Sequence, residues 1–308
     1  MKKIAIIGLS GESIFMHLDD FPLPSVTVHA KFYHEEPGGK GYNQAVACRK
    51  LGCDVSYCSK IGDDYYGKRC IDYLESIGIR TFFTKDFSAR TAVATILTSQ
   101  NGENEVIVHP GASKNLNICD LENFKQEIIN ADILLLQYEI DIKVLKEALR
   151  IAKENNTLVI LNPAPAIYED KDILESVDIL IPNFEELKKL YALPKNILID
   201  EIGAMLAKRV NNILIVTLGS KGCILIQNHM YRYYPAYKVN AIDTTGAGDT
   251  FNAAIASYLS KNKTLDEAIQ YAMAASALSV TKSYVMNAIP TDEEVCRFIK
   301  LYNLKEKL

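Results

Sequence analysis

The stretch that decides the fold reads DTTGAGDTF and spans residues 243–251. The residues before it, 237–242, form a short extended segment in pattern, and those from Asp249 to Leu259 predict an amphipathic helix. Gly246 and Gly248 free the backbone to turn, which leaves several N–H groups pointing outward at the start of a helix. Such N–H groups, with the positive end of the helix dipole behind them, favour an anion.

A carboxylate at this place is unexpected, because Asp249 lies where an anion is expected to bind. An acid beside an anion hole is typical of a catalytic base next to a transferred phosphoryl group. The alternative is that Asp249 is the N-cap of an ordinary helix. Spacing and glycines alone leave both interpretations open.

Composition narrows the class of protein. The 308 residues are 48% hydrophobic and 23% charged, with a net charge of −4, which is ordinary for a globular protein with a buried core. Basic residues form no run longer than short pairs, so nucleic acid and anionic membranes are poor partners. No apolar run approaches the roughly 20 residues that span a bilayer, and residues 1–8 predict a first core strand, not a signal peptide.

The seven cysteines indicate a reduced, cytoplasmic protein. No C-x-x-C pair occurs, which argues against a zinc site, and an odd number argues against a disulfide scaffold. We expect most of these thiols to be buried as small apolar side chains.

The first third of the chain mixes buried elements with half-exposed strands. A buried strand over 3–8 is followed by alternating strands over 13–19 and 26–32, and a second alternating pair, joined by Asn101-Gly102, covers 91–99 and 105–109. Between the pairs, the pattern predicts helices over 39–51 and 63–76 and a strand over 54–61.

The rest of the chain has the βαβ rhythm of a parallel sheet. Buried strands are predicted over 132–136, 157–161, 178–181 and 213–217, helices over 142–154 and 184–191, and a hairpin over 222–226 and 229–234. We therefore expect one α/β domain over residues 1–308, a three-layer sandwich with a central, mostly parallel sheet. Two lid segments, at about 10–38 and 90–110, form a small β-sheet lid.

A second glycine cluster, PGGKGYNQA, covers residues 37–45 at the end of the first lid hairpin. Its glycines let the backbone approach a ligand closely, and Lys40 and Asn43 supply hydrogen-bond donors. The alternative is a tight turn with a helix cap.

Taken together, these motifs resemble those of the ribokinase-like (PfkB) carbohydrate kinases. Residues 38–47 are similar to the first signature of that family, and residues 243–252 closely match the second. Three further matches lie between them in the family's order: NPAPA at 162–166, an N-x-x-E at 183–186 and TLGSKG at 217–222. The resemblance covers essentially the whole chain.

The resemblance implies an ATP-dependent phosphoryl transfer. In the family, the residue matching Asp249 takes the proton of the substrate hydroxyl, and the amides matching Gly246, Ala247 and Gly248 form the hole for the γ-phosphoryl oxygens. The residues matching Asn183 and Glu186 organise Mg²⁺ through its waters, although Asn183 also fits a helix cap.

The resemblance also implies the ligand contacts. Nucleotide-binding positions correspond to Asn183, Thr217, Gly219, Gly222 and Gly248. Substrate-binding positions correspond to Gly38, Gly39, Lys40, Asn43 and Glu139, the last at the end of a buried strand. Asp243 and Thr245 match part of the family's monovalent-cation loop, which would hold K⁺.

The chain departs from the family at two places. Members that bind ribose carry an Asn and an Asp that grip sugar hydroxyls where this chain has Gly11 and Ser13, so the resemblance implies a changed substrate. In the cation loop, Tyr284 replaces a usual Gly and Ala288 a usual Ser, which argues against K⁺ activation, although backbone carbonyls could still bind the ion.

Four aromatic or imidazole side chains leave the substrate class open. They either make the pocket more aromatic or pack in the core of the lid: Phe15, His17, Phe32 and Tyr42. We expect an ATP-dependent kinase acting on a hydroxymethyl group of a sugar or sugar-like molecule. The alternatives are a nucleoside or hydroxymethylpyrimidine kinase of the same fold and a non-catalytic sugar sensor. The lid also leaves a strand edge that could pair across a homodimer.

Overall fold

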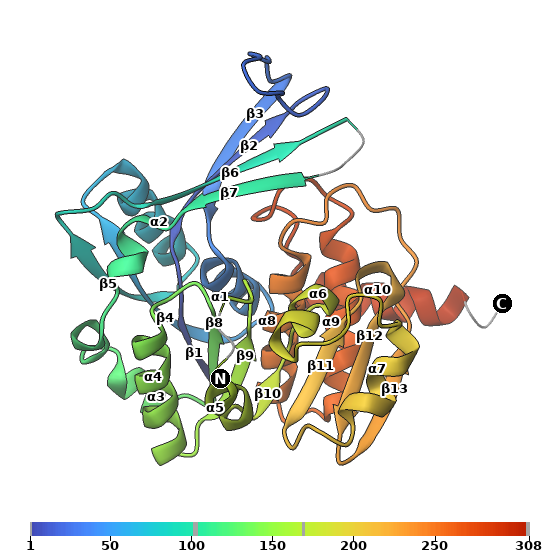
Figure 1. Ribbon diagram of the computed structural model, residues 1–308. Coiled ribbons are helices and arrows are strands. Elements are labelled where there is room, and N and C mark those ends of the chain that lie inside the picture. Colours follow the sequence, from blue (N-terminus) through green and yellow to red (C-terminus); the bar gives the residue numbers. More distant parts are fainter. Residues whose placement is uncertain (1, 101–103, 168–169, 306–308) are drawn as a thin grey trace.

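A nine-stranded sheet forms the centre of the molecule in a computed structural model that describes residues 2–100, 104–167 and 170–305. Along the sheet the strands are ordered β13-β12-β11-β10-β9-β8-β1-β4-β5 (Figure 1). They are parallel except at one edge, where β12 and β13 form an antiparallel hairpin. Their bounds are β1 Lys3–Ile7, β4 Asp54–Gly62, β5 Arg80–Asp86, β8 Ile133–Gln137, β9 Leu158–Asn162, β10 Ile179–Leu180, β11 Ile213–Thr217, β12 Cys223–Gln227 and β13 Met230–Tyr234.

Helices cover both faces of the sheet, because its strands are apolar on both sides. In β1, Ile4 and Ile6 belong to one core and Ala5 and Ile7 to the other. The first core is closed by α1 Lys40–Lys50, α2 Tyr65–Ser76, α8 Ala247–Ser260, α9 Leu265–Ser279 and α10 Asp292–Lys305. The second is closed by α3 Lys125–Ile129, α4 Ile142–Glu154, α5 Lys171–Ser176, α6 Phe184–Leu190 and α7 Ile199–Leu206. The predicted three-layer α/β architecture is confirmed.

A separate four-stranded sheet forms the lid and projects away from the body (Figure 1). Its order is β3-β2-β6-β7, with bounds β2 Gly11–His17, β3 Phe32–Gly38, β6 Ala92–Thr98 and β7 Asn104–His109. The inner strands β2 and β6 are parallel, and each is paired with its outer strand in antiparallel fashion. The predicted second strand over 26–32 is wrong, since β3 begins only at Phe32. The Asn101-Gly102 turn lies outside the described residues.

Three segments differ from what the hydrophobic pattern of the sequence predicts. The sequence predicts no strand over residues 80–86, yet β5 forms there at the sheet edge, and none of its side chains is fully buried. Helix α9 is rich in alanine and buried on most sides, so it has no strong amphipathic period. The predicted extended segment 237–242 has no strand pairing.

The chain order reverses between β8 and β1, which lie side by side although β4 follows β1 along the chain. In open α/β sheets, ligands bind at the carboxyl ends of strands at such a switch point. Among the described residues, no helix is long and apolar enough to span a bilayer. All seven cysteines are free thiols, and five of them are buried.

Candidate active site

A pocket of about 130 Å³ lies beyond the carboxyl ends of the central strands. It brings together residues from five of the predicted motifs, which are separated by up to about 200 positions in the chain. Its lining comprises Lys40, Asn162, Ala164, Ile181, Asn183, Glu186, Thr217, Gly246, Gly248, Asp249 and Asn252.

Asp249 lies in the first turn of α8, but it does not cap the helix. The N-cap is Gly246, whose φ of 74° is in the left-handed region that glycine tolerates, and Asp249 is the third residue of α8. The Asp249 carboxylate instead accepts hydrogen bonds from two side chains of α1, Asn43 Nδ2 at 2.8 Å and Gln44 Nε2 at 3.0 Å. The N-cap interpretation is therefore wrong, and the carboxylate faces the pocket side of α1.

Two buried amide side chains form a chain of hydrogen bonds that ends at Asp249. Gln137, the last residue of β8, donates from Nε2 to Gln44 Oε1 at 2.6 Å, and Gln44 in turn donates to Asp249. Both glutamines are fully buried. Because Gln44 accepts from one partner and donates to the next, its amide orientation is determined, and so is the position of the Asp249 oxygen that it holds.

Lys40 sits among three carboxylates. Burial lowers the pKa of the Lys40 ammonium, but Glu139, Asp249 and Glu186 together raise it, and the net shift is upward. The pKa of Asp249 is raised by burial, an effect opposed by Lys40 and by the hydrogen bonds from Asn43 and Gln44. A carboxylate with a raised pKa and an acceptor role is suited to take a proton from a hydroxyl.

Asn183 and Glu186 form a reciprocal capping box at the start of α6. The Asn183 side chain accepts from the Glu186 N–H at 2.8 Å, and Glu186 Oε2 accepts from the Asn183 N–H at 2.8 Å. The helix-cap interpretation of Asn183 is therefore correct, and both residues also line the pocket. Burial raises the pKa of the Glu186 carboxyl.

A divalent ion would find few direct ligands here. Within the described ranges, no group of three or more His, Cys, Asp or Glu side chains is arranged to hold a metal. Glu186 still has one carboxylate oxygen outside the capping box, and Asp249 lies in the same pocket. This donor set fits Mg²⁺, which keeps most of its waters and takes the remaining ligands from phosphates.

A second pocket adjoins the first on the lid side. It contains the predicted substrate positions Gly11, Ser13, Gly38, Gly39 and Glu139, and its other walls are Leu9, Glu12, Ala92, Val93, Ala94 and Val108. The two pockets meet where the Lys40 N–H donates to Glu139 Oε2 at 2.8 Å. Burial raises the pKa of Glu139, and Lys40 opposes this rise.

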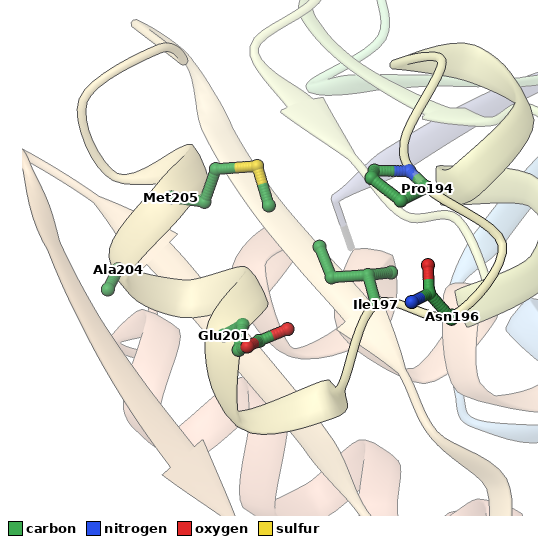
Figure 2. Close-up of a pocket in the computed structure, with 6 residues that line it drawn as sticks. All are labelled: Pro194, Asn196, Ile197, Glu201, Ala204 and Met205. Atoms are coloured by element: carbon green, nitrogen blue, oxygen red, sulfur yellow. The ribbon is translucent and has the colours of Figure 1, made fainter.

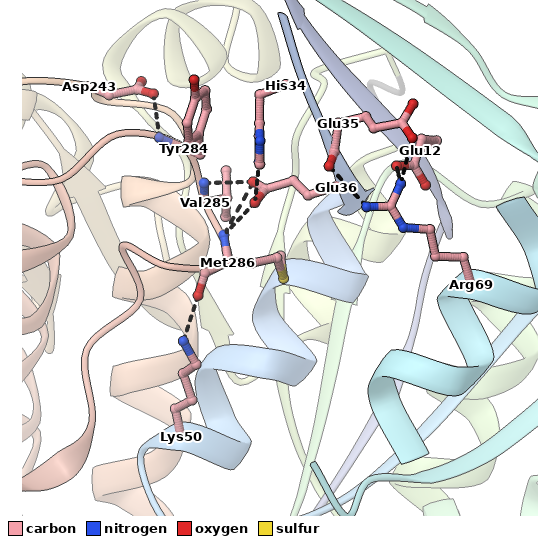
Figure 3. Close-up of polar contacts among 10 residues, drawn as sticks. All are labelled: Glu12, His34, Glu35, Glu36, Lys50, Arg69, Asp243, Tyr284, Val285 and Met286. Atoms are coloured by element: carbon pink, nitrogen blue, oxygen red, sulfur yellow. Dashed lines mark hydrogen bonds and ion pairs between the residues drawn. The ribbon is translucent and has the colours of Figure 1, made fainter. Parts of the chain in front are cut away.

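The lid strand leaves no space for a side chain at Gly11. A Cβ there would lie 2.4 Å from the carbonyl oxygen of Ala92 on β6. A Cβ on Gly38 would lie 2.2 Å from Ser13 Oγ, so this hydroxyl occupies the space beside the glycine. Glu12 lines this pocket, and its carboxylate pairs through Oε1 with Arg69 of α2 (Figure 3). Burial raises the pKa of Glu12 to about 7.

Several predicted residues line neither pocket. Gly219 is the first residue of the turn η3 Gly219–Lys221, and Gly222 follows its last residue. A Cβ on Gly222 would lie 2.0 Å from the Tyr234 carbonyl oxygen, so close backbone packing alone requires glycine there. Asp243 binds the main chain, accepting from the Thr245 N–H at 2.9 Å and the Tyr284 N–H at 3.0 Å. Ala247 begins α8, and its N–H lies 3.3 Å from the Thr244 carbonyl.

The aromatic side chains also lie outside both pockets. Phe15 and Tyr42 are fully buried, and the Tyr42 hydroxyl donates to the Cys70 carbonyl. Phe15 and His17 pack edge-on against Tyr284, and Phe32 packs edge-on against His17. The interpretation as lid core is correct for Phe15, whereas Phe32 is 68% exposed and Tyr42 packs in the core of the body against Tyr57 and Tyr73.

A larger hollow, of about 640 Å³, lies away from these residues between α7 and the loop before it (Figure 2). Its lining is Pro194, Asn196, Ile197, Glu201, Ala204 and Met205, and Figure 2 shows their side chains on the loop and on α7. Its one carboxylate, Glu201, already accepts the Leu198 N–H at the helix start. The hollow contains no residue of the predicted motifs.

Sequence reasoning missed four polar residues of the site, namely Gln44, Gln137, Asn162 and Asn252. Gln44 and Asn162 are within motifs quoted above, and Gln137 and Asn162 end adjacent buried strands, which is a signal for ligand-side polar groups. Asn252 lies one turn after Gly248 and donates to its carbonyl at 2.9 Å.

Comparison with known proteins identifies relatives over nearly the full chain. The model of the pfkB family of carbohydrate kinases matches residues 1–292. A ribokinase from Haemophilus influenzae is 33% identical over 305 residues, covering 97% of this chain and 99% of the relative. A deoxyribokinase from Salmonella typhi is 32% identical over 304 residues, with coverage of 97% and 99%. The structure of Arabidopsis thaliana ribokinase complexed with ribose and ATP superposes with a TM-score of 0.82 at 27% identity, covering 97% of this chain and 98% of that one.

Proposed function

This chain belongs to the pfkB family of carbohydrate kinases, and we propose that its two adjoining pockets carry out the family's reaction on a sugar poorer in hydroxyl groups than ribose. The protein is an ATP-dependent kinase that transfers the γ-phosphoryl group to an alcohol group of a sugar or sugar-like molecule. The observation that carries the site proposal is the buried Asp249 at the start of α8. Its carboxylate accepts hydrogen bonds from two amide side chains of α1 and interacts with the charge of Lys40.

In the proposed reaction, the acceptor hydroxyl lies between Asp249 and the γ-phosphorus. The hydroxyl oxygen attacks phosphorus, its proton passes to the Asp249 carboxylate, and the bond from the γ-phosphorus to the bridging oxygen breaks to release ADP. The start of α8, at Gly246 and Gly248, directs its dipole and peptide N–H groups toward the transferred group. Lys40 lines the same pocket and adds a positive charge to it.

Mg²⁺ neutralises charge on the ATP phosphates when it is bound. In the proposal, Glu186 and Asn183 orient the ion's waters from the start of α6, where both line the pocket. Thr217, which lines the same pocket at the end of β11, contacts the nucleotide. We assign Gly219 and Gly222 a supporting role in the turn that follows.

Three features support a hydroxyl-poor acceptor. Gly11 contributes no side chain, Ser13 contributes only one hydroxyl, and the lining from β6 and β7 consists of alanine and valine. A sugar hydroxyl buried against this wall would lose its water without gaining a partner, at a cost of about 1–3 kcal/mol. A deoxysugar carries a hydrogen where that hydroxyl would be, and it avoids this cost. Glu139 remains as an acceptor for a hydroxyl that the substrate keeps.

The test is a set of phosphorylation rates with ATP and Mg²⁺. We expect kcat/KM to be higher for 2-deoxyribose than for ribose, and higher for both than for purine or pyrimidine nucleosides. The variant Ser13→Ala should reduce kcat/KM for ribose more than for 2-deoxyribose. A tenfold or larger preference for ribose would contradict the substrate proposal, since about 1.4 kcal/mol would then favour the extra hydroxyl.

We also propose a homodimer formed through the lid. Three consecutive residues of the edge strand β7, Val106, Ile107 and Val108, are each about half exposed or more. An exposed apolar edge strand is a template for pairing with another chain. Sedimentation velocity should give a dimer for the wild type and a shift toward monomer for Ile107→Lys. A monomeric wild type would contradict the proposal.

Finally, we propose that the protein works in the cytoplasm. The support is the set of free, mostly buried thiols, because such thiols persist in a reducing compartment. Fractionation of expressing cells, followed by immunodetection, tests the location.

A further inference from the structure

Glu36 joins two parts of the molecule that are far apart in the chain. It lies in β3 of the lid, two residues before Gly38 of the substrate pocket, and its side chain is 7% exposed. Its carboxylate accepts hydrogen bonds from the N–H groups of Val285, at 2.7 Å, and Met286, at 3.2 Å (Figure 3). These partners are 249 and 250 positions away along the chain.

The segment that Glu36 holds packs against the start of the anion-binding turn. A Cβ on Gly246 would lie only 2.7 Å from Val285 Cγ1, so the Val285 side chain rests directly on the bare Cα of Gly246. One residue earlier, the Tyr284 N–H donates to Asp243, whose other carboxylate oxygen accepts the Thr245 N–H. Residues 284 and 285 therefore contact the turn at two places, at Asp243, where it begins, and at Gly246, its left-handed glycine.

A second contact holds the same segment to the lid. Tyr284 has a φ of 67°, which is unusual for a bulky residue, and its ring stacks on His34 of β3 with centroids 3.9 Å apart. From below, Lys50 at the end of α1 donates to the Met286 carbonyl at 2.5 Å (Figure 3). The backbone of residues 284–286 is therefore fixed by the lid, by α1 and by Asp243.

We propose that Glu36 is a positioning residue for phosphoryl transfer: its carboxylate holds Val285 against Gly246 and thereby keeps the anion-binding turn in place relative to the lid. This inference rests on the proposed function of that turn. Glu36 does not line either pocket, so it acts through Val285 and not through the substrate.

The chemistry of the contact favours such a role. A carboxylate that accepts two main-chain N–H groups defines the position of both, and charge-assisted hydrogen bonds of this kind are stronger than neutral ones. Because Gly38 follows Glu36 so closely in β3, a movement of the sugar-side glycines moves the carboxylate as well. One side chain thus connects the sugar-binding side of the site with the phosphate-binding side.

The test compares Glu36→Ala and Glu36→Gln with Glu35→Gln as the matched control. Glu35 is the neighbouring lid carboxylate, and its side chain binds Arg69 and Tyr33 instead of residues 284–286. We expect Glu36→Ala to lower kcat by about tenfold to a hundredfold, because small misplacements of a reacting group cost rate on this scale. KM for the sugar should change by less than about threefold. Glu36→Gln keeps one acceptor and should recover part of the rate, and Glu35→Gln should behave like the wild type.

Amide hydrogen exchange provides a measurement that does not depend on activity. In Glu36→Gln and Glu36→Ala, residues 243–248 should exchange faster than in the wild type, whereas in Glu35→Gln they should not. Unchanged exchange in 243–248, or a rate loss carried entirely by KM, would overturn the inference. If the wild type phosphorylates no sugar, the proposed function fails, and the exchange data still decide whether Glu36 positions the turn.

Discussion

Replacing Gln44 with leucine tests the chain of hydrogen bonds from Gln137 through Gln44 to Asp249. The change keeps the approximate volume of a fully buried side chain and removes all its hydrogen-bonding groups. Gln44 donates to Asp249 at 3.0 Å and accepts from Gln137 at 2.6 Å. In Gln44→Leu, one oxygen of the buried Asp249 carboxylate and one buried N–H of Gln137 therefore lose their partners, as does Asn162 Oδ1, to which Gln44 Nε2 also donates at 3.4 Å.

The expected loss of stability can be estimated from the two shorter bonds, to Asp249 and from Gln137. A hydrogen bond to a charged group contributes about 1.5–3 kcal/mol and a neutral one about 0.5–1.5 kcal/mol, so their loss should lower the free energy of unfolding by about 2–4 kcal/mol. The donor also lowers the pKa of Asp249, so its removal raises that pKa. Because the base must be ionised, kcat/KM should then begin to fall at a higher pH as the solution is acidified.

Two measurements on one variant separate the effects. Urea unfolding reports the free energy of unfolding, and the pH dependence of kcat/KM reports ionisation of the base. The control is Gln126→Leu, the same change at an exposed position of α3, which should leave both unchanged. Wild-type stability and rate in Gln44→Leu would refute the reasoning. A loss of stability with no change in the pH at which kcat/KM falls on acidification would show that Gln44 supports the fold without acting on Asp249.

Three further changes are expected to have distinct signatures. Asp249→Asn should lower kcat by about 10²–10⁴-fold, the usual contribution of a general base, while calorimetry shows ATP-analogue binding within a few-fold of the wild type. Lys40→Met removes a positive charge that lowers the pKa of Asp249, so that pKa rises and the acid limb of kcat/KM shifts to higher pH; a shift to lower pH would contradict the assignment. Gly11→Ala puts a Cβ 2.4 Å from the Ala92 carbonyl oxygen and should lower the free energy of unfolding by about 1–3 kcal/mol in urea; an unchanged value would mean that the lid strands move apart freely.

Much of the site could be predicted because its residues occur in short, continuous motifs at strand ends. Asp249 and Gly246 lie within one turn of chain, and Asn183 and Glu186 are one helical turn apart. The β–α alternation then brings such segments to the same edge of the sheet. Motifs that lie at strand ends in such an alternation are therefore enough to predict a shared pocket.

Other contacts could not be predicted, because they depend on register and on side-chain direction. Gln44 and Gln137 are 93 positions apart, and nothing in either local sequence indicates the partner. The second lid strand begins at Phe32 because β3 pairs with β2 from Gly11–Gly38 outward, a register set by the glycines and not by the alternation over 26–32. Strand β5 forms at an edge, where none of its side chains is fully buried, so its hydrophobic pattern is weak.

The separation between Glu36 and Val285 also has a consequence for synthesis of the chain on the ribosome. The lid strands and the first glycine cluster emerge early, whereas residues 284–286 emerge only after both of them and after Gly246. Until then the Glu36 carboxylate lacks its two main-chain donors, and the turn at Gly246 lacks Val285. Phosphoryl transfer is therefore expected to become possible only after residues 284–286 have emerged and have joined the lid to the anion-binding turn.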